Sequence, residues 1–128
     1  MAGGLTLARE AIAIDPGCVE ALEHLATVLV TRRHKYAEGL DLIDGAVGLR
    51  SGDAGLWYAR GWLYEFAAHE IRRARRPNAA ADTKADARAL YTTAALSFRR
   101  CLDLRPEGKL EGDAMDLLDH VENELLSL

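Results

Sequence analysis

The sequence predicts an all-α fold made of repeated helix pairs, and three observations support this prediction. The 128-residue chain is 49% hydrophobic and 28% charged and holds only three prolines, which is typical of a globular helical domain. Apolar residues recur three, four and seven positions apart, which is the spacing of one helix face. One arrangement of small and bulky residues also occurs three times, which indicates a helical repeat within a single domain.

The three copies set the spacing of the repeat. A small residue stands at Ala11, Ala46 and Cys101, so the copies are 35 and then 55 residues apart. In the front half of two copies, a bulky residue is followed four positions later by a small one, Ala26 or Gly61. A small side chain at this place lets two helices approach closely. The longer second interval indicates that the third unit contains an insertion.

Six helices are expected, and local features define their ends. Asp15-Pro16 ends the first helix, because the residue before a proline avoids the helical conformation. Asp53 is a suitable N-cap for the fourth helix, and Pro77 stops that helix. The expected helices are Ala2–Ile14, Val19–Arg32, Tyr36–Leu49, Ala54–Arg76, Ala80–Leu104 and Gly112–Leu126.

The pattern resembles the tetratricopeptide repeat (TPR), which runs W-x2-L-G-x2-Y, then A-x3-F, then P, over 34 residues. The matching residues are Trp57, Gly61, Tyr64, Ala94, Phe98 and Pro106. Arg60, Gly39 and Ser51 depart from the pattern, where Leu, Ala and Pro are usual. The resemblance covers about residues 4–108 and implies a right-handed solenoid of about two and a half units. These units are a partial repeat at 1–17, a repeat at 18–53, an extended repeat at 54–108 and a capping helix at 109–128.

The third unit is expected to contain an extended helical hairpin. Its 55-residue interval exceeds the 34-residue repeat by 21 residues, all between Tyr64 and Tyr91. This stretch is rich in helix formers and has one proline, which favours longer helices over a loop. If each helix gains about ten residues, the hairpin projects roughly 15 Å beyond its neighbours.

The resemblance implies that the first helix of each unit lines a concave groove. Tyr58 and Trp62 lie between the residues of the packing stripe and are expected to face away from the core. Aromatic rings beside carboxylates suit an extended or helical peptide with apolar anchors and some basic charge. The alternative is that Trp62 and Phe66 pack against the long second helix or against a dimer partner. The candidate partner-binding residues are Glu20, Glu23, Thr27, Tyr58, Trp62, Glu65 and Phe66.

A basic cluster follows in the same helix, formed by Arg72, Arg73, Arg75 and Arg76. It is a candidate contact for phosphate, an acidic partner or nucleic acid. The alternative is structural, because cations at a helix C-terminus meet the negative end of the helix dipole. No aromatic residue alternates with these arginines, so single-stranded nucleic acid is disfavoured. The net charge of −4 likewise gives no general attraction to nucleic acid or to a membrane.

Nothing in the sequence indicates catalysis, a metal or a cofactor. The four histidines are scattered, and His69-Glu70 lacks the second histidine of the zinc-protease motif. Thr92, Thr93 and Ser97 lie within a predicted helix with no histidine nearby to act as a base. No apolar run is long enough for a transmembrane helix, and Arg9 and Glu10 interrupt the apolar core that a secretory signal needs, so a cytoplasmic location is expected. The two cysteines are expected to be free thiols.

The expected function is therefore non-catalytic protein–protein interaction, with the chain acting as a scaffold or adaptor that binds a protein or peptide. The carboxylate-gripping Lys, Asn and Arg of some family members are absent, which disfavours a co-chaperone role. Self-association is an alternative, through an uncovered face around Leu5, Ala8 and Ile12 that would form a homo-oligomer. A fragment of a longer repeat protein is another alternative. Binding of nucleic acid or phosphate by the arginine cluster is the weakest.

Overall fold

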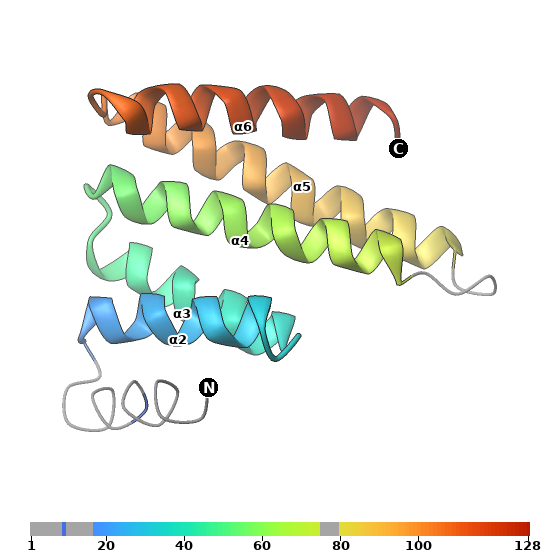
Figure 1. Ribbon diagram of the computed structural model, residues 1–128, viewed down its shortest axis with the longest axis horizontal. Helices are drawn as coiled ribbons and strands as arrows, with labels where there is room; N and C mark the ends of the chain where they lie inside the picture. Colours follow the sequence, from blue (N-terminus) through green and yellow to red (C-terminus); the bar gives the residue numbers. More distant parts are fainter. Residues whose placement is uncertain (1–8, 10–16, 75–79) are drawn as a thin grey trace.

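The computed structural model describes Arg9, residues 17–74 and residues 80–128, and the elements in these residues are all helices (Figure 1). In chain order these are α2 (Val19–Thr31), α3 (Tyr36–Leu49), α4 (Ala54–Arg73), α5 (Ala80–Asp103) and α6 (Lys109–Leu126). Successive helices pair as hairpins, α2 with α3 and α4 with α5, and α6 packs on the second hairpin. The all-α prediction is confirmed for the described residues.

The helix bounds agree closely with the predicted ones, with two corrections. The helix α4 ends at Arg73 rather than Arg76, because Ala74 already leaves the helical conformation. The helix α6 begins at Lys109 rather than Gly112. Its start follows Gly108, whose φ of 64° and ψ of −136° belong to a region that only glycine occupies freely. Apart from Arg9, which is helical, the predicted helix at 2–14 lies outside the described residues, as does the predicted stop at Pro77.

The helix α4 is the central element, because it packs against each of the other four described helices. Its start is fixed by the predicted N-cap, since the Asp53 carboxylate accepts a hydrogen bond from the Leu56 amide at 3.3 Å. One apolar core lies among α2, α3 and α4 and includes Val30, Ile43 and Leu63. A second core lies among α4, α5 and α6. Both cores therefore depend on α4.

Two glycines allow the helices of each hairpin to approach closely. A Cβ atom at Gly61 would lie 2.6 to 2.8 Å from three carbons of the buried Phe98 ring. A Cβ atom at Gly39 would lie 2.6 Å from Val30 Cγ2 and 3.0 Å from the Ala26 carbonyl oxygen. Because real carbon atoms do not approach so closely, only glycine fits at these two crossings.

The second hairpin is longer than the first. The helices α4 and α5 have 20 and 24 residues, whereas α2 and α3 have 13 and 14. At 1.5 Å per residue, α4 is roughly 10 Å longer than α2. Figure 1 shows α4 and α5 running past the end of the α2–α3 pair. No helix in the described residues is long and apolar enough to cross a membrane. Both cysteines are free thiols, as expected.

Candidate functional site

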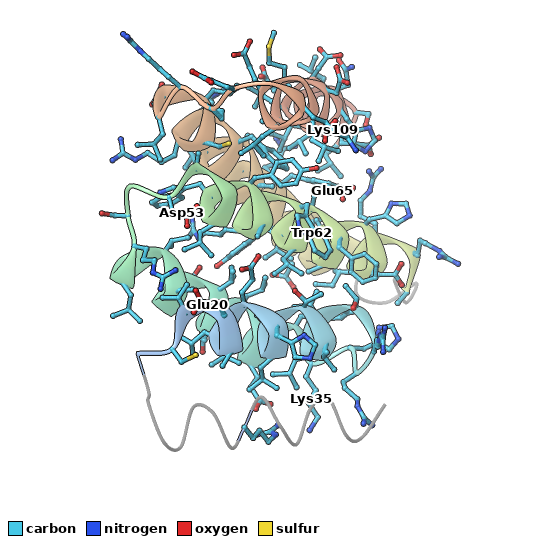
Figure 2. All side chains as sticks on the ribbon, turned by 60° about the vertical axis from the view of Figure 1, so that its left-hand side comes forward. Glu20, Lys35, Asp53, Trp62, Glu65 and Lys109 are labelled. Atoms are coloured by element: carbon cyan, nitrogen blue, oxygen red, sulfur yellow. The ribbon has the colours of Figure 1, made fainter. Side chains whose placement is uncertain are left out.

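The candidate partner-binding residues lie on α2 and α4, two helices that pack against each other. On its other side α4 packs against α6, so these three helices are neighbours in the order α2, α4, α6. Glu20, Glu23 and Thr27 come from α2, and Tyr58, Trp62, Glu65 and Phe66 come from α4. Figure 2 shows Glu20 on α2, Trp62 on the central helix, and Glu65 on the side of α4 that faces α6.

The aromatic residues of α4 are half-buried, and this corrects the expectation that Tyr58 and Trp62 face away from the core. The Tyr58 ring packs beside Phe98 with ring centroids 5.8 Å apart. Phe66 packs against the first core, and Trp62 packs against both cores. The helical period gives the direction in which a side chain leaves its own helix, but α4 packs against four other helices. Residues between the packing stripes are therefore covered in part.

Trp62 still offers a polar edge. Its indole N–H has no hydrogen-bond acceptor among the described residues, and its side chain is only partly buried. Trp57, on the same helix, differs in this respect, because its indole N–H donates to the Ser51 carbonyl oxygen at 2.8 Å. Tryptophan with a buried body and a free N–H is the kind of residue that anchors protein interfaces.

The carboxylates near the start of α4 repel one another. Burial, together with the nearby charges of Asp53 and Glu20, raises the pKa of Glu23 above its ordinary value. Glu20 pairs with Arg50 at 2.9 Å, whereas Glu23 forms no ion pair within the described residues. The surface beside α2 and the start of α4 thus carries excess negative charge.

The remaining two candidates make contacts within the protein. The Thr27 hydroxyl donates to the Glu23 carbonyl oxygen at 2.9 Å, as helical threonines commonly do. The Glu65 carboxylate lies 3.6 Å from His120 Nε2, so it links α4 to α6. Glu65 does not form the surface pair with His69 that its helical spacing suggests. It is therefore the weakest of the seven candidates for a partner contact.

The described part of the arginine cluster is occupied by internal contacts. Arg72 forms an ion pair with Glu124 of α6 and lies 5.9 Å from the centre of the buried Tyr91 ring. Arg73 lies 3.6 Å from Glu70 one turn earlier. Arg75 and Arg76 lie outside the described residues. Arg72 thus holds α6 against α4, which favours the structural interpretation of this residue.

A polar network around Arg60 was not identified from the sequence. Arg60 Nε donates to Asp44 Oδ1 at 2.8 Å, and Arg60 Nη1 donates to the Ser97 hydroxyl at 3.0 Å. The Tyr64 hydroxyl lies 3.0 Å from both oxygens of Asp44. The guanidinium also lies 5.6 Å from the centre of the Trp57 ring. The one sequence feature that marks this site is an arginine where the repeat pattern has leucine.

The network links helices that do not pack on each other. Asp44 belongs to α3 and Ser97 to α5, and these two helices have no direct backbone packing within the described residues. Arg60 bridges them from α4 through one hydrogen bond to each side. The network is therefore a structural connection between the two hairpins.

The network predicts a loss of stability at high pH. Burial, and then the charge of Asp44, raise the pKa of Tyr64 to about 12. Because the folded pKa lies above the ordinary value of 10.0, this contribution to stability is complete below about pH 10 and is lost as the pH rises toward 12. Urea unfolding at several pH values should show the free energy of unfolding falling in this window. In Tyr64→Phe the fall should be smaller, and an equal fall in both proteins would contradict the assignment.

Other chemical groups are occupied or dispersed in the described residues. The hydroxyls of Thr92 and Ser97 donate to the carbonyl oxygens of Arg88 and Thr93, each at 2.8 Å. No group of three or more His, Cys, Asp or Glu side chains in this part of the chain is placed to hold a metal ion. A scan against models of known protein families finds no match, and a search of curated proteins finds no similar chain.

Proposed function

We propose that the protein is a non-catalytic interaction module of the TPR type, in which the surface of α2 and α4 binds a peptide or protein segment. The observation that carries this proposal is Trp62, which is half-buried on the central helix and whose indole N–H has no acceptor among the described residues. A partner that contacts Trp62 costs little side-chain conformational entropy, because the surrounding helices already hold this side chain in place.

The charge of the surface suggests the chemistry of the partner. Burial, and then the charges of Asp53 and Glu20, raise the pKa of Glu23, so a cation placed there would relieve the repulsion among these carboxylates. Burial raises the pKa of the Tyr58 hydroxyl, and the nearby charge of Asp113 on α6 raises it further. We expect the partner to be a segment with one apolar side chain that contacts Trp62. Its basic side chains would lie over the carboxylates of Glu23 and Asp53.

Several features support the TPR-type architecture. The spacing of the repeated residues, the close crossing of Gly61 with Phe98 and the central position of α4 between α2 and α6 agree with it. The helix α6 covers α5 with Val121 and Leu118 and exposes charged residues on its other side, as a terminal cap does.

The proposal predicts that Trp62→Ala reduces peptide binding by about tenfold or more. Short peptides selected from a random phage library on the immobilised wild-type chain serve as the probe, and isothermal titration calorimetry gives their Kd. The selected peptides should be basic and contain one large apolar residue. Glu23→Lys should weaken their binding as well.

Two controls make the result interpretable. Trp57→Phe removes a tryptophan from the same helix whose indole is already hydrogen-bonded internally, so it should leave the Kd unchanged. Circular dichroism must show equal helical content in all variants. If the selected peptides bind Trp62→Ala and Glu23→Lys as tightly as wild type, this surface is not the binding site.

A further inference from the structure

Two surface patches of opposite charge lie at opposite ends of the helical stack. The first, which we term the basic turn, joins α2 to α3 and consists of Arg32, Arg33, His34 and Lys35. The second, which we term the outer face of α6, consists of Met115, Asp116, Asp119 and Leu126. Figure 1 places the α2–α3 hairpin and α6 on opposite sides of the α4–α5 hairpin. The helices α2 and α3 have no packing against α6.

The basic turn has a fixed backbone. His34 takes a φ of 55°, in the left-handed region that ends many helices. The Lys35 amide donates to the Leu29 carbonyl oxygen at 2.9 Å, and His34 Nδ1 is hydrogen-bonded to the Tyr36 hydroxyl at 3.0 Å. Arg32, Arg33 and Lys35 are all exposed, and none of them forms an ion pair within the described residues. The turn therefore presents three positive charges from a rigid position.

The outer face of α6 is acidic and also partly apolar. It lies opposite Ala114 and Val121, which are completely buried. Met115 and Leu126 are 54% and 86% exposed, so two large apolar side chains remain uncovered. Asp116 and Asp119 are exposed and pair with no described cation. The only carboxylates of α6 with a described partner are Glu122 and Glu124, which pair with Arg99 and Arg72.

We propose that the basic turn of one copy docks on the outer face of α6 of a second copy. The charges of the two patches are complementary, and within one molecule the α4–α5 hairpin lies between them. The aliphatic stems of the arginines would cover Met115 while their guanidinium groups meet Asp116 and Asp119, which lie close to Met115 along the helix. Because the two patches lie on opposite sides of the α4–α5 hairpin, the copies associate head to tail rather than as a symmetric dimer. This inference is independent of the peptide-binding surface.

A contact of this size is weak and depends on salt. A few exposed ion pairs contribute modestly and are screened at high ionic strength, so raising the salt from low to high should weaken association by about tenfold. Sedimentation equilibrium of the full chain over a range of concentrations measures this. A wild-type protein that is monomeric at every concentration in low salt overturns the proposal, as does association that is insensitive to salt.

A charge exchange tests which surfaces meet. One variant carries Arg32→Glu and Arg33→Glu, and the other carries Asp116→Lys and Asp119→Lys. Each variant alone should associate about tenfold more weakly than wild type, because two like-charged patches then face each other. An equimolar mixture should associate again, because every contact between the two variants then joins opposite charges: the native turn meets the native α6, and the reversed turn meets the reversed α6. If the mixture associates no more strongly than either variant alone, the proposal is overturned.

Matched controls separate this contact from other effects. Asp41→Lys with Asp103→Lys changes the net charge as much as the α6 variant does, at exposed acidic positions outside both patches. This control should associate like wild type, and weakening equal to that of the α6 variant would show that only net charge matters. Trp62→Ala should also associate like wild type, so failure of the peptide-binding proposal and failure of this one are distinguishable.

Discussion

Gly61→Ala should lower the free energy of unfolding by about 2 kcal/mol, although alanine favours a helix more than glycine does. The added Cβ would lie 2.6 Å from the nearest carbon of the Phe98 ring. That ring is completely buried, so it has no free space to move into. Separation of α4 from α5 would loosen the second core, which lies among α4, α5 and α6. Thermal and urea unfolding measure the loss.

The matched control for this prediction is Gly45→Ala. Gly45 is also helical, but a Cβ there meets nothing within 4 Å, so only the propensity of alanine acts. Gly45→Ala should therefore stabilise the protein by up to about 1 kcal/mol. Combining Gly61→Ala with Phe98→Leu should show that the two changes are coupled, because the smaller side chain relieves the clash. If Gly61→Ala is as stable as Gly45→Ala, the close crossing of α4 and α5 is wrong.

Arg60→Leu should lower the free energy of unfolding by about 1 to 2 kcal/mol, even though leucine is the usual residue of the repeat pattern. The arginine side chain is 20% exposed and binds Asp44 and Ser97 from two different helices. Without Arg60, Asp44 keeps only the Tyr64 hydroxyl as a hydrogen-bond donor among the described residues. Leucine supplies apolar contact but no donor for the half-buried carboxylate.

A double-mutant cycle isolates this interaction. Asp44→Ala and Arg60→Leu together should destabilise less than the sum of the two single changes. Arg50→Leu is the comparison, because Arg50 and Glu20 also lie 2.9 Å apart but their side chains are 51% and 70% exposed. That exposed pair should contribute less than the pair of Arg60 and Asp44, because solvent and salt screen it. Additive effects of Asp44→Ala and Arg60→Leu would show that the network does not connect the hairpins.

Part of the candidate site was predictable from sequence and part was not. The helical period placed Glu20, Glu23 and Trp62 on α2 and α4, where they are found. It did not predict how far Trp62 is buried, because that depends on the helices on either side of α4. It also did not predict that Arg72 is neutralised by Glu124, which lies 52 residues later in the chain. The partner of a long charged side chain depends on which distant helix lies beside it.

The sequence alone determined the helices of the described chain and the small residue at their crossing. Caps such as Asp53, and apolar spacing along one helix, act over a few residues, so they can be identified without knowledge of the neighbours. Only the tertiary structure decided the role of Arg60. It departs from the repeat pattern in sequence, yet its partners stand 16 and 37 residues away. Hydrogen bonds from a charged side chain form only within about 3 Å, and helix packing alone brings these groups that close.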